Sequence, residues 1–538
     1  MALTIAARVP EPATPPARRI AFNTVIFSIA TGLSRVAGLV REVVASSYFG
    51  TSGPFSAFTI AFQVPNLLRA LVADSALSAA FVPVFTELLE QKKRKDAFQL
   101  AGALFGLILV VLGAVTLLFI VIAPWVIPPI TGGKFSAELD QLTVGLSRVM
   151  FPIVVLLGLN GLVVGILNAY DHFAIPAIAP VVWNLVIIAG LVALKPLFEG
   201  PDEVYAYALG VLAGTVVQFG MCLPVLRRVG FELKISFAFR DPRILRVLRL
   251  MLPVTIGLGL INFNLLINSV LGSLVSVGAP AAIDRAFRLY MLPQGVFSVA
   301  VATVLFPTLS RFAARRDLEG LRRASGNGVR MIALFLIPAA VGTAVLAEPL
   351  TRLVYERGEF GPASTDAATE ALFWFSFSMP FAGANLLLTR TFFSLQRPWV
   401  PTTLAGVTLL INIGVSAALY QPYGIAGVVI GTAVASAAMT LGQAYRIRQE
   451  LHGFEIARTL QAVALMLAAS ALLGAVAFFG WEALDDALGD SLVAQFVSVT
   501  LALTVASAVY AAAAVVLRIP EARQIAGIVQ RRLGRSAS

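Results

Sequence analysis

Long runs of hydrophobic residues alternate with short polar connections along the whole chain. A helix needs about 20 apolar residues to cross a bilayer, and most of these runs reach that length. None alternates with the period of two that a membrane β-strand shows, so we interpret them as transmembrane helices. We expect fourteen spans, at approximately 22–48, 55–89, 100–125, 142–168, 175–196, 204–226, 247–276, 284–311, 328–348, 370–395, 400–420, 424–446, 460–481 and 492–517.

The composition supports an all-α polytopic membrane protein and excludes a water-soluble one. Of the 538 residues, 58% are hydrophobic and 13% are charged, against about 25% charged in an ordinary soluble domain. The single cysteine, Cys222, excludes an internal disulfide. The two histidines, His172 and His452, lie far apart in the sequence. We therefore expect no metal site built on these residues and no cofactor.

Lysine and arginine are concentrated in alternate connections. Four basic residues lie at 92–95, seven at 227–249 and six at 311–330, whereas the connections at 46–54, 196–203 and 481–490 are neutral or acidic. By the positive-inside rule the basic connections face the cytoplasm, as do both termini, and the number of spans is even. The same bias accounts for the basic net charge without nucleic acid as a partner. The N-terminal tail lacks the apolar core of a cleaved signal peptide.

Weak internal echoes indicate a duplication. Residues 425–432 repeat the pattern of residues 208–215, and Ala286-Phe287 and Pro307 echo Ala61-Phe62 and Pro83 at a similar offset. An even number of spans in each half makes the repeats parallel, which places a substrate path between two lobes. The expected divisions are a cytoplasmic tail (1–19), an N-lobe of six spans (20–228), a C-lobe of six spans (229–450), spans 13 and 14 (451–520) and a second cytoplasmic tail (521–538).

Several charged residues fall inside the predicted spans, where a charge costs about 3 kcal/mol and is a functional candidate. The set comprises Arg35, Arg41 and Glu42 in span 1, Arg69 and Asp74 in span 2, and Asp284, Arg285 and Arg288 in span 8. Two structural alternatives stay open. Arg41 and Glu42 could reach the headgroups at the outer end of their helix, and Asp284 could form an ion pair with Arg288 at i, i+4. Asp74, Asp284 and Arg285 are therefore candidates for helix pairing or gating.

Several arginines with few carboxylates predict an anionic ligand. The guanidinium group binds phosphate with two donors and stays charged, whereas an exporter of cationic drugs would need buried acids. The amide of Asn412 is interpreted as a tie between helices. A site for a cation built from Asn412, Thr432 and backbone carbonyls is the alternative.

The sequence resembles the MurJ (MviN) family of lipid II flippases from about residue 20 to 450. The segments that carry this resemblance appear in the family's order and spacing. They are Ser34–Glu42, Val64–Pro83, Ile166–Pro180, Arg288–Gly295 and Leu305–Ser310.

The resemblance implies a carrier of the multidrug/oligosaccharidyl-lipid/polysaccharide exporter superfamily in the bacterial cytoplasmic membrane. Such a carrier moves lipid II, the undecaprenyl-pyrophosphate-linked peptidoglycan precursor, to the outer leaflet, and binds lipid II and membrane lipids. Other cell-wall synthesis proteins are candidate partners. By the resemblance Arg35, Arg41, Arg69 and Arg288 bind substrate together with Glu42, where the family commonly has aspartate. Spans 13 and 14 would form a groove for the lipid tail.

One departure from the family concerns a sodium site. The turn before span 11 reads Gln396–Pro401 instead of the frequent Asp-Thr-Lys-Thr-Pro, and neither span 7 nor span 11 contains a carboxylate. We therefore do not expect a sodium site built on such acids.

Three other functions compete with lipid II transport. An exporter of another undecaprenyl-linked oligosaccharide would need the same arginines, and a multidrug antiporter is disfavoured by the shortage of membrane carboxylates. A polyprenyl-phosphate glycosyltransferase would need a larger loop with paired catalytic acids, so we expect no enzyme. The chain also has no nucleotide-binding loop of the Gly-x-x-x-x-Gly-Lys type.

Overall fold

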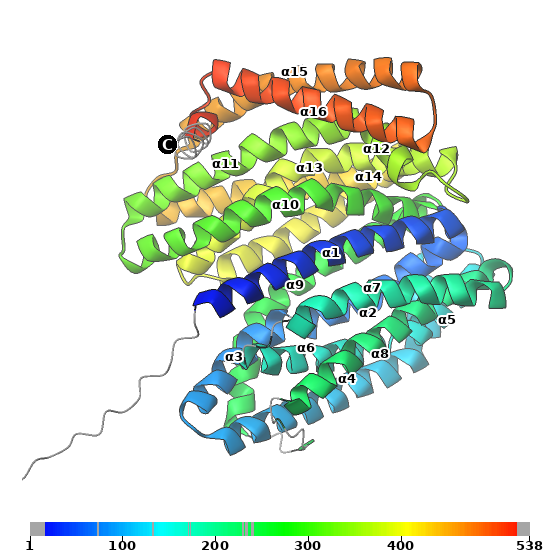
Figure 1. Ribbon diagram of the computed structural model, residues 1–538, viewed down its shortest axis with the longest axis vertical. Coiled ribbons are helices and arrows are strands. Elements are labelled where there is room, and N and C mark those ends of the chain that lie inside the picture. Colours follow the sequence, from blue (N-terminus) through cyan, green and yellow to red (C-terminus); the bar gives the residue numbers. More distant parts are fainter. Residues whose placement is uncertain are drawn as a thin grey trace, which may run out of the picture.

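The structure, a computed structural model, describes residues 17–72, 75–131, 134–170, 172, 174–228, 231, 235–237 and 241–524. The regular elements in these ranges are helices (Figure 1). They are α1 (Ala17–Phe49), α2 (Gly53–Val72), α3 (Ser75–Glu90), α4 (Arg94–Thr131), α5 (Ala137–Met150), α6 (Ile153–Ala169), α7 (Ala174–Leu194), two short 3-10 turns η1 (Lys195–Leu197) and η2 (Gly200–Glu203), α8 (Val204–Arg228), α9 (Pro242–Val275), α10 (Ala279–Ala314), α11 (Leu318–Val345), α12 (Ala347–Tyr355), α13 (Pro362–Ser394), α14 (Trp399–Glu450), α15 (Ile456–Leu488) and α16 (Leu492–Val516).

The predicted all-helical fold with about fourteen crossings is confirmed. Within the described ranges, ten continuous helical segments are long and apolar enough to span a membrane by themselves. Fourteen crossings result when α2–α3 and α5–α6 count as one each, α14 counts as two, and the short α12 is left out. Large apolar side chains such as Leu117 and Trp125 of α4 and Phe479 of α15 are exposed. In a bilayer these side chains would face the lipid.

A turn divides α14 into the two predicted spans 11 and 12. Gly424 has φ of 57°, a backbone conformation that glycine adopts without strain. Beyond it the chain runs back along itself, because the Ser416 hydroxyl donates to the Val428 carbonyl at 2.9 Å and Thr408 lies beside Met439.

The two lobes occupy separate halves of the molecule (Figure 1). Helices α1 to α8 form one half, α10 to α14 form the other, and α9 packs against α2 and α3 as well as α14. The sequence echo has a structural counterpart in close helix packing. Gly210 and Gly214 of α8 lie against the backbone of α7, as Gly431 lies against Asn412 in the first half of α14.

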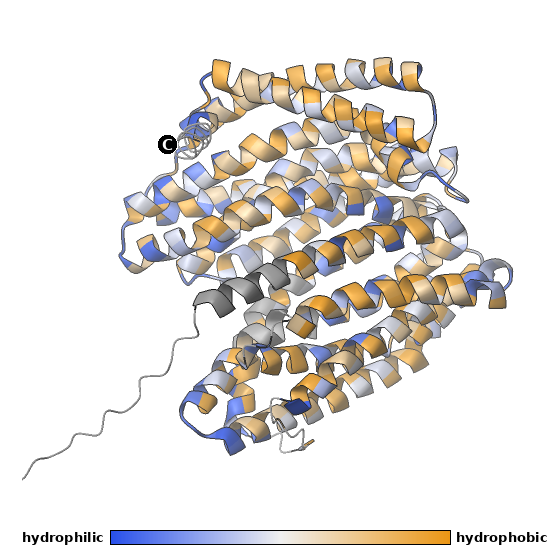
Figure 2. Cartoon of the chain, in the orientation of Figure 1, coloured by the Kyte–Doolittle hydropathy of each residue, from blue (hydrophilic) through white to orange (hydrophobic). Residues whose placement is uncertain are grey.

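Polar residues gather at the two ends of the helix bundle (Figure 2). We call one the basic end; it carries the links α3–α4 and α10–α11 with their lysines and arginines. The other, the neutral end, carries the links α1–α2, α9–α10 and α12–α13. Helix α1 therefore runs from the basic end to the neutral end, and α10 runs in the opposite direction.

The last two helices are attached to the C-lobe near the basic end. Helix α15 packs against α11 and α16, along the edge of the molecule (Figure 1). Arg330 of α11 donates from Nε to Glu521 at 2.5 Å and from Nη1 to Glu455 at 2.8 Å. Glu521, the first residue of the expected tail 521–538, is fully buried. The expected domain boundaries stay a prediction.

Candidate functional site

Five charged residues from α1 and α10 form a cluster between the lobes, which we call the Glu42 cluster. It consists of Arg41, Glu42, Asp284, Arg285 and Arg288. The Glu42 carboxylate accepts from Arg41 and Arg285 and lies 3.0 Å from Arg288 Nη1. Asp284 lies 3.3 Å from Arg285 Nη2 and 2.9 Å from Arg288 Nε. Three guanidinium groups thus surround two carboxylates, which leaves an excess of one positive charge.

Aromatic rings cover the buried side of this cluster. The Arg41 guanidinium lies 4.8 Å from the Trp183 ring and the Arg285 guanidinium lies 4.5 Å from the Phe55 ring. Such contacts stabilise a cation that has lost its hydration. Arg288 is the most open member, with 33% of its side chain exposed. The excess positive charge is therefore accessible on the side of Arg288.

Arg35 lies seven residues before Glu42 on α1, about 10 Å closer to the basic end. Its side chain is exposed and reaches towards α10, where its Nη1 would lie 3.5 Å from a Cβ atom at Gly295. The Arg35 guanidinium therefore lies beside α10, between the lobes.

Arg69 lies on α2 at a similar depth, about 20–25 Å from the neutral end. Its Nε and Nη2 donate to Asn66 Oδ1 at 3.1 and 2.9 Å. The Asn66 amide in turn donates to Asn262 of α9 at 3.2 Å. This chain of hydrogen bonds orients Arg69 beside α9. We refer to Arg35 and Arg69 as the mid-membrane arginines.

The family follows from comparison with known proteins. The family model described as lipid II flippase MurJ matches residues 45–496. A probable lipid II flippase MurJ of Vibrio cholerae is 30% identical over 440 residues, which cover 80% of this chain and 83% of the relative. The chain belongs to the MurJ family. The lipid II flippase MurJ of Burkholderia cenocepacia is 33% identical over 387 residues, which cover 71% of this chain and 75% of that protein.

Solved structures show the same fold. The inward closed conformation of a lipid II flippase MurJ superposes with a TM-score of 0.74 at 23% identity, covering 90% of this chain and 98% of that one. An inward-facing multidrug resistance transporter of the MATE family superposes with a TM-score of 0.66 at 17% identity, covering 80% and 99%. At these identities the likeness concerns the fold alone.

In this member of the MurJ family, Asn412 joins α14 to α9. Its amide nitrogen donates to Asn264 at 2.6 Å and to Asn268 at 3.0 Å, while its oxygen accepts from Ser416 at 3.2 Å. Asn268 donates to Thr432 at 2.9 Å. The network has the geometry of a tie between helices. A cation site at Asn412 and Thr432 stays a prediction. Among the described residues no group of three or more His, Cys, Asp or Glu side chains could hold a metal ion.

Several partners of the predicted residues are not evident from the sequence. Phe55 and Trp183 carry no local signal, because an aromatic residue in an apolar span is unremarkable until a cation lies against it. Asn66 was detectable, since it stands three residues before Arg69 and shares its helix face. Asp74, a predicted gating residue, lies outside the described residues.

Proposed function

We propose that this protein moves lipid II from the cytoplasmic to the outer leaflet of the bacterial cytoplasmic membrane. Its membership of the MurJ family and the names of its relatives support this substrate. The observation that carries the proposal is that arginines of both lobes lie where α1 faces α10. Arg288 stands 3.0 Å from Glu42, and Arg35 lies beside Gly295.

The arginines suit a pyrophosphate. A guanidinium binds a phosphate with two parallel donors, and a low-dielectric surrounding strengthens each charge-assisted hydrogen bond. In this proposal the mid-membrane arginines and Arg288 clamp the pyrophosphate. Arg41 and Glu42 complete the site, since Glu42 holds three guanidinium groups in place while no anion is bound.

Transport follows from rocking of one lobe against the other, with the basic end in the cytoplasm. In the structure the lobes meet at the neutral end, where Glu359 N donates to Ser47 O at 2.9 Å. The proposed pivots are Gly32, Gly38 and Gly295, because glycine accepts changed backbone angles. Asp284 and Arg285 act as gating residues that join the lobes through Glu42, and Asp74 stays a candidate for the same role.

The lipid tail is proposed to lie along α15 and α16. These helices stand at the edge of the molecule and expose large apolar side chains such as Leu467, Phe479 and Val505. A polyprenyl chain could remain in the bilayer beside them while its headgroup crosses between the lobes. Other proteins of cell-wall synthesis are further candidate partners.

Depletion with complementation tests the proposal. The host flippase is depleted, this chain is expressed, and growth and outer-leaflet lipid II are measured with a lipid II-binding probe added outside the cell. We expect rescue by the parent protein and by Arg148→Ala, which removes an arginine that contacts a carbonyl of α4. Arg35→Ala should fail to rescue. Growth without outer-leaflet lipid II, or no rescue by the well-expressed parent, would favour the alternative of another undecaprenyl-linked oligosaccharide.

A further inference from the structure

At the neutral end, the turn between α1 and α2 is held by the connector between α12 and α13. The Ser47 carbonyl is one of the last four of α1, which have no partner within the helix. It accepts from Glu359 N at 2.9 Å, so the C-lobe caps this helix of the N-lobe. The hydroxyls of Thr51 and Ser364 lie 2.8 Å apart beside this bond.

Three glycines let the two main chains approach each other. A Cβ atom at Gly358 would collide with the Ser47 carbonyl, and one at Gly50 would collide with the Glu359 carbonyl. At Gly278, in the link between α9 and α10, a Cβ atom would stand 2.6 Å from the Thr51 carbonyl oxygen. Each colliding atom belongs to the backbone, so it cannot move away as the end of a flexible side chain could. All three contacts join one lobe to the other.

We propose that Gly50, Gly278 and Gly358 form a backbone seal that closes the neutral end of the carrier. A side chain at any of these positions would collide with the main chain of the opposite lobe. Closure at this level involves main-chain and hydroxyl groups, and the charges lie deeper, in the Glu42 cluster. The proposal rests on alternating access in the proposed function, and it assigns these glycines to positioning the lobes.

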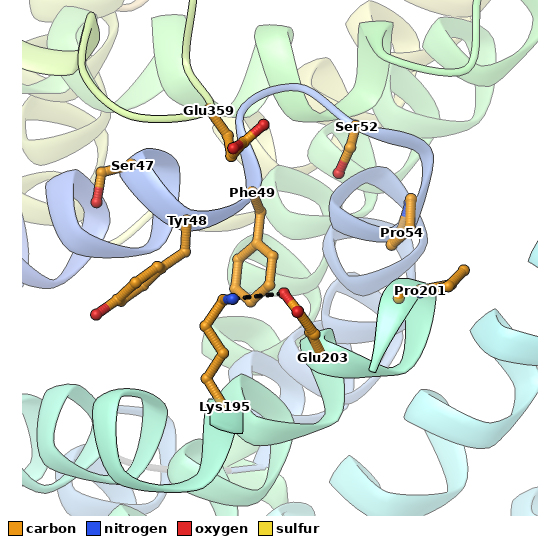
Figure 3. Close-up of a pocket in the computed structure, with 10 residues that line it drawn as sticks. Ser47, Tyr48, Phe49, Ser52, Pro54, Lys195, Pro201, Glu203 and Glu359 are labelled. Atoms are coloured by element: carbon orange, nitrogen blue, oxygen red, sulfur yellow. Dashed lines mark ion pairs between the residues drawn. The ribbon is translucent and has the colours of Figure 1, made fainter. Parts of the chain in front are cut away.

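The outer edge of the seal lines a pocket. A pocket of about 410 Å³ opens at the neutral end, and both Ser47 and Glu359 line it together with Lys195 and Glu203 (Figure 3). The Lys195 ammonium pairs with Glu203 at 2.7 Å within the N-lobe. Beneath the seal Ser46 is fully buried. The main-chain contacts therefore separate the solvent of the pocket from the interior.

Backbone strain alone does not explain the three glycines. Gly50 and Gly358 have φ of 57° and 59°, which disfavours other residues irrespective of contacts. Gly278 has φ of −87°, an ordinary value, so the contact with Thr51 is what excludes a side chain there. Gly200 provides the opposite case, with φ of 57° and nothing within 4 Å of a Cβ atom. Gly200→Ala is therefore the matched control for strain without collision.

Cysteine labelling of the purified protein in detergent tests the seal. The buried Cys222 is replaced by alanine, and Ser46→Cys reports opening through its reaction with a polar maleimide. We expect Gly278→Ala and Gly358→Ala to speed labelling about tenfold, equivalent to ~1.4 kcal/mol, because an overpacked contact disfavours the closed state. Gly200→Ala should label at the parent rate. Equal rates in all four proteins would overturn the proposal.

A second measurement keeps all three glycines, so it remains possible if the alanine variants do not fold. Thr51→Cys and Ser364→Cys replace the two hydroxyl groups across the seal and should form a disulfide on oxidation. We expect the disulfide to suppress labelling of the Ser46→Cys reporter at least tenfold, and reduction to restore it. A reporter that labels equally fast with the disulfide formed would show that the seal does not cover Ser46. Both measurements need no substrate, so they remain valid if the transported lipid is not lipid II.

Discussion

Glu42 of α1 and Arg285 of α10 form an ion pair that joins the two lobes, with 3% and 1% of their side chains exposed. These residues stand 243 positions apart in the sequence. A buried ion pair loses much of its Coulombic gain to desolvation, but removing one partner leaves an uncompensated charge and costs about 3–5 kcal/mol. Separation of the lobes at the Glu42 cluster therefore requires another anion, or water, to replace Glu42 beside the arginines. The substrate's pyrophosphate would meet that requirement.

The first prediction concerns this pair. Glu42→Gln leaves three guanidinium groups with Asp284 as their one carboxylate in the cluster, so we expect the free energy of unfolding to fall by about 3 kcal/mol and complementation to fail. Glu42→Asp keeps the charge and should retain part of the activity. The double variant Glu42→Gln, Arg285→Met should be more stable than the sum of the single variants predicts, by about 1 kcal/mol or more. Thermal unfolding in detergent measures this, and strictly additive effects would contradict the pairing.

The second prediction separates binding from stability among the arginines. Arg35 is exposed, so Arg35→Ala should abolish transport with a melting temperature close to that of the parent. Arg288→Ala should abolish transport and also lower the melting temperature, because Glu42 and Asp284 lose a partner. At Arg35, Arg69 and Arg288, lysine should impair transport, since it lacks the planar pair of donors. Full complementation by all three alanine variants would exclude the clamp.

How much of this site could be read from the sequence depends on how local each interaction is. Asp284 and Arg288 are four residues apart on one helix, and their ion pair was among the expected alternatives. The pairing of Glu42 with Arg285 depends on how α1 packs against α10, and nothing near either residue encodes it. The long apolar runs predicted the crossings, but not the break between α5 and α6 at Pro152. The burial of Glu521 was missed because a charged residue after the last span usually lies in solvent.

A third prediction tests the closing of the basic end. Leu88 of α3 and Phe312 of α10 belong to different lobes and lie near this end. Cysteines at these positions, once linked, should hold the basic end closed and stop transport. The control pair is Phe312→Cys with Gly320→Cys, which lie side by side within one lobe and should be harmless when linked. Unchanged transport in the linked inter-lobe variant would indicate a static path.

The fourth prediction concerns the attachment of the last two helices. Arg330 is almost fully buried between Glu455 and Glu521. Arg330→Met leaves the buried Glu521 without its cation, while Glu455 keeps Arg458 at 4.0 Å. We therefore expect a loss of about 3 kcal/mol in stability and faster proteolysis after residue 450. Arg323→Ala removes an exposed ion pair with Glu319 and should change stability by less than about 1 kcal/mol. Equal effects of the two substitutions would show that the buried cluster does not hold α15 and α16.

The last prediction concerns the source of energy. Lipid II carries negative charge on its pyrophosphate, and the cytoplasm is electrically negative. Moving one elementary charge through 100 mV is worth about 2.3 kcal/mol, so net outward movement of one negative charge favours export by about fiftyfold. The arginines stay with the protein and return without substrate, so part of this gain depends on whether they move through the field.

The residues of spans 7 and 11 favour the membrane potential, and not a sodium gradient, as the energy source of transport. The Asn412 amide nitrogen donates to Asn264 and Asn268, which ties α14 to α9, and its oxygen accepts from Ser416. Neither span contains a carboxylate that would balance the charge of a bound cation. We therefore expect sodium to be dispensable. Collapsing the potential with valinomycin and potassium should stop the appearance of lipid II at the outer leaflet, and replacing sodium with choline should not. If transport survives the first treatment and fails in the second, Asn412 and Thr432 become the place to look for a bound cation, and Asn412→Ala should then abolish the sodium dependence.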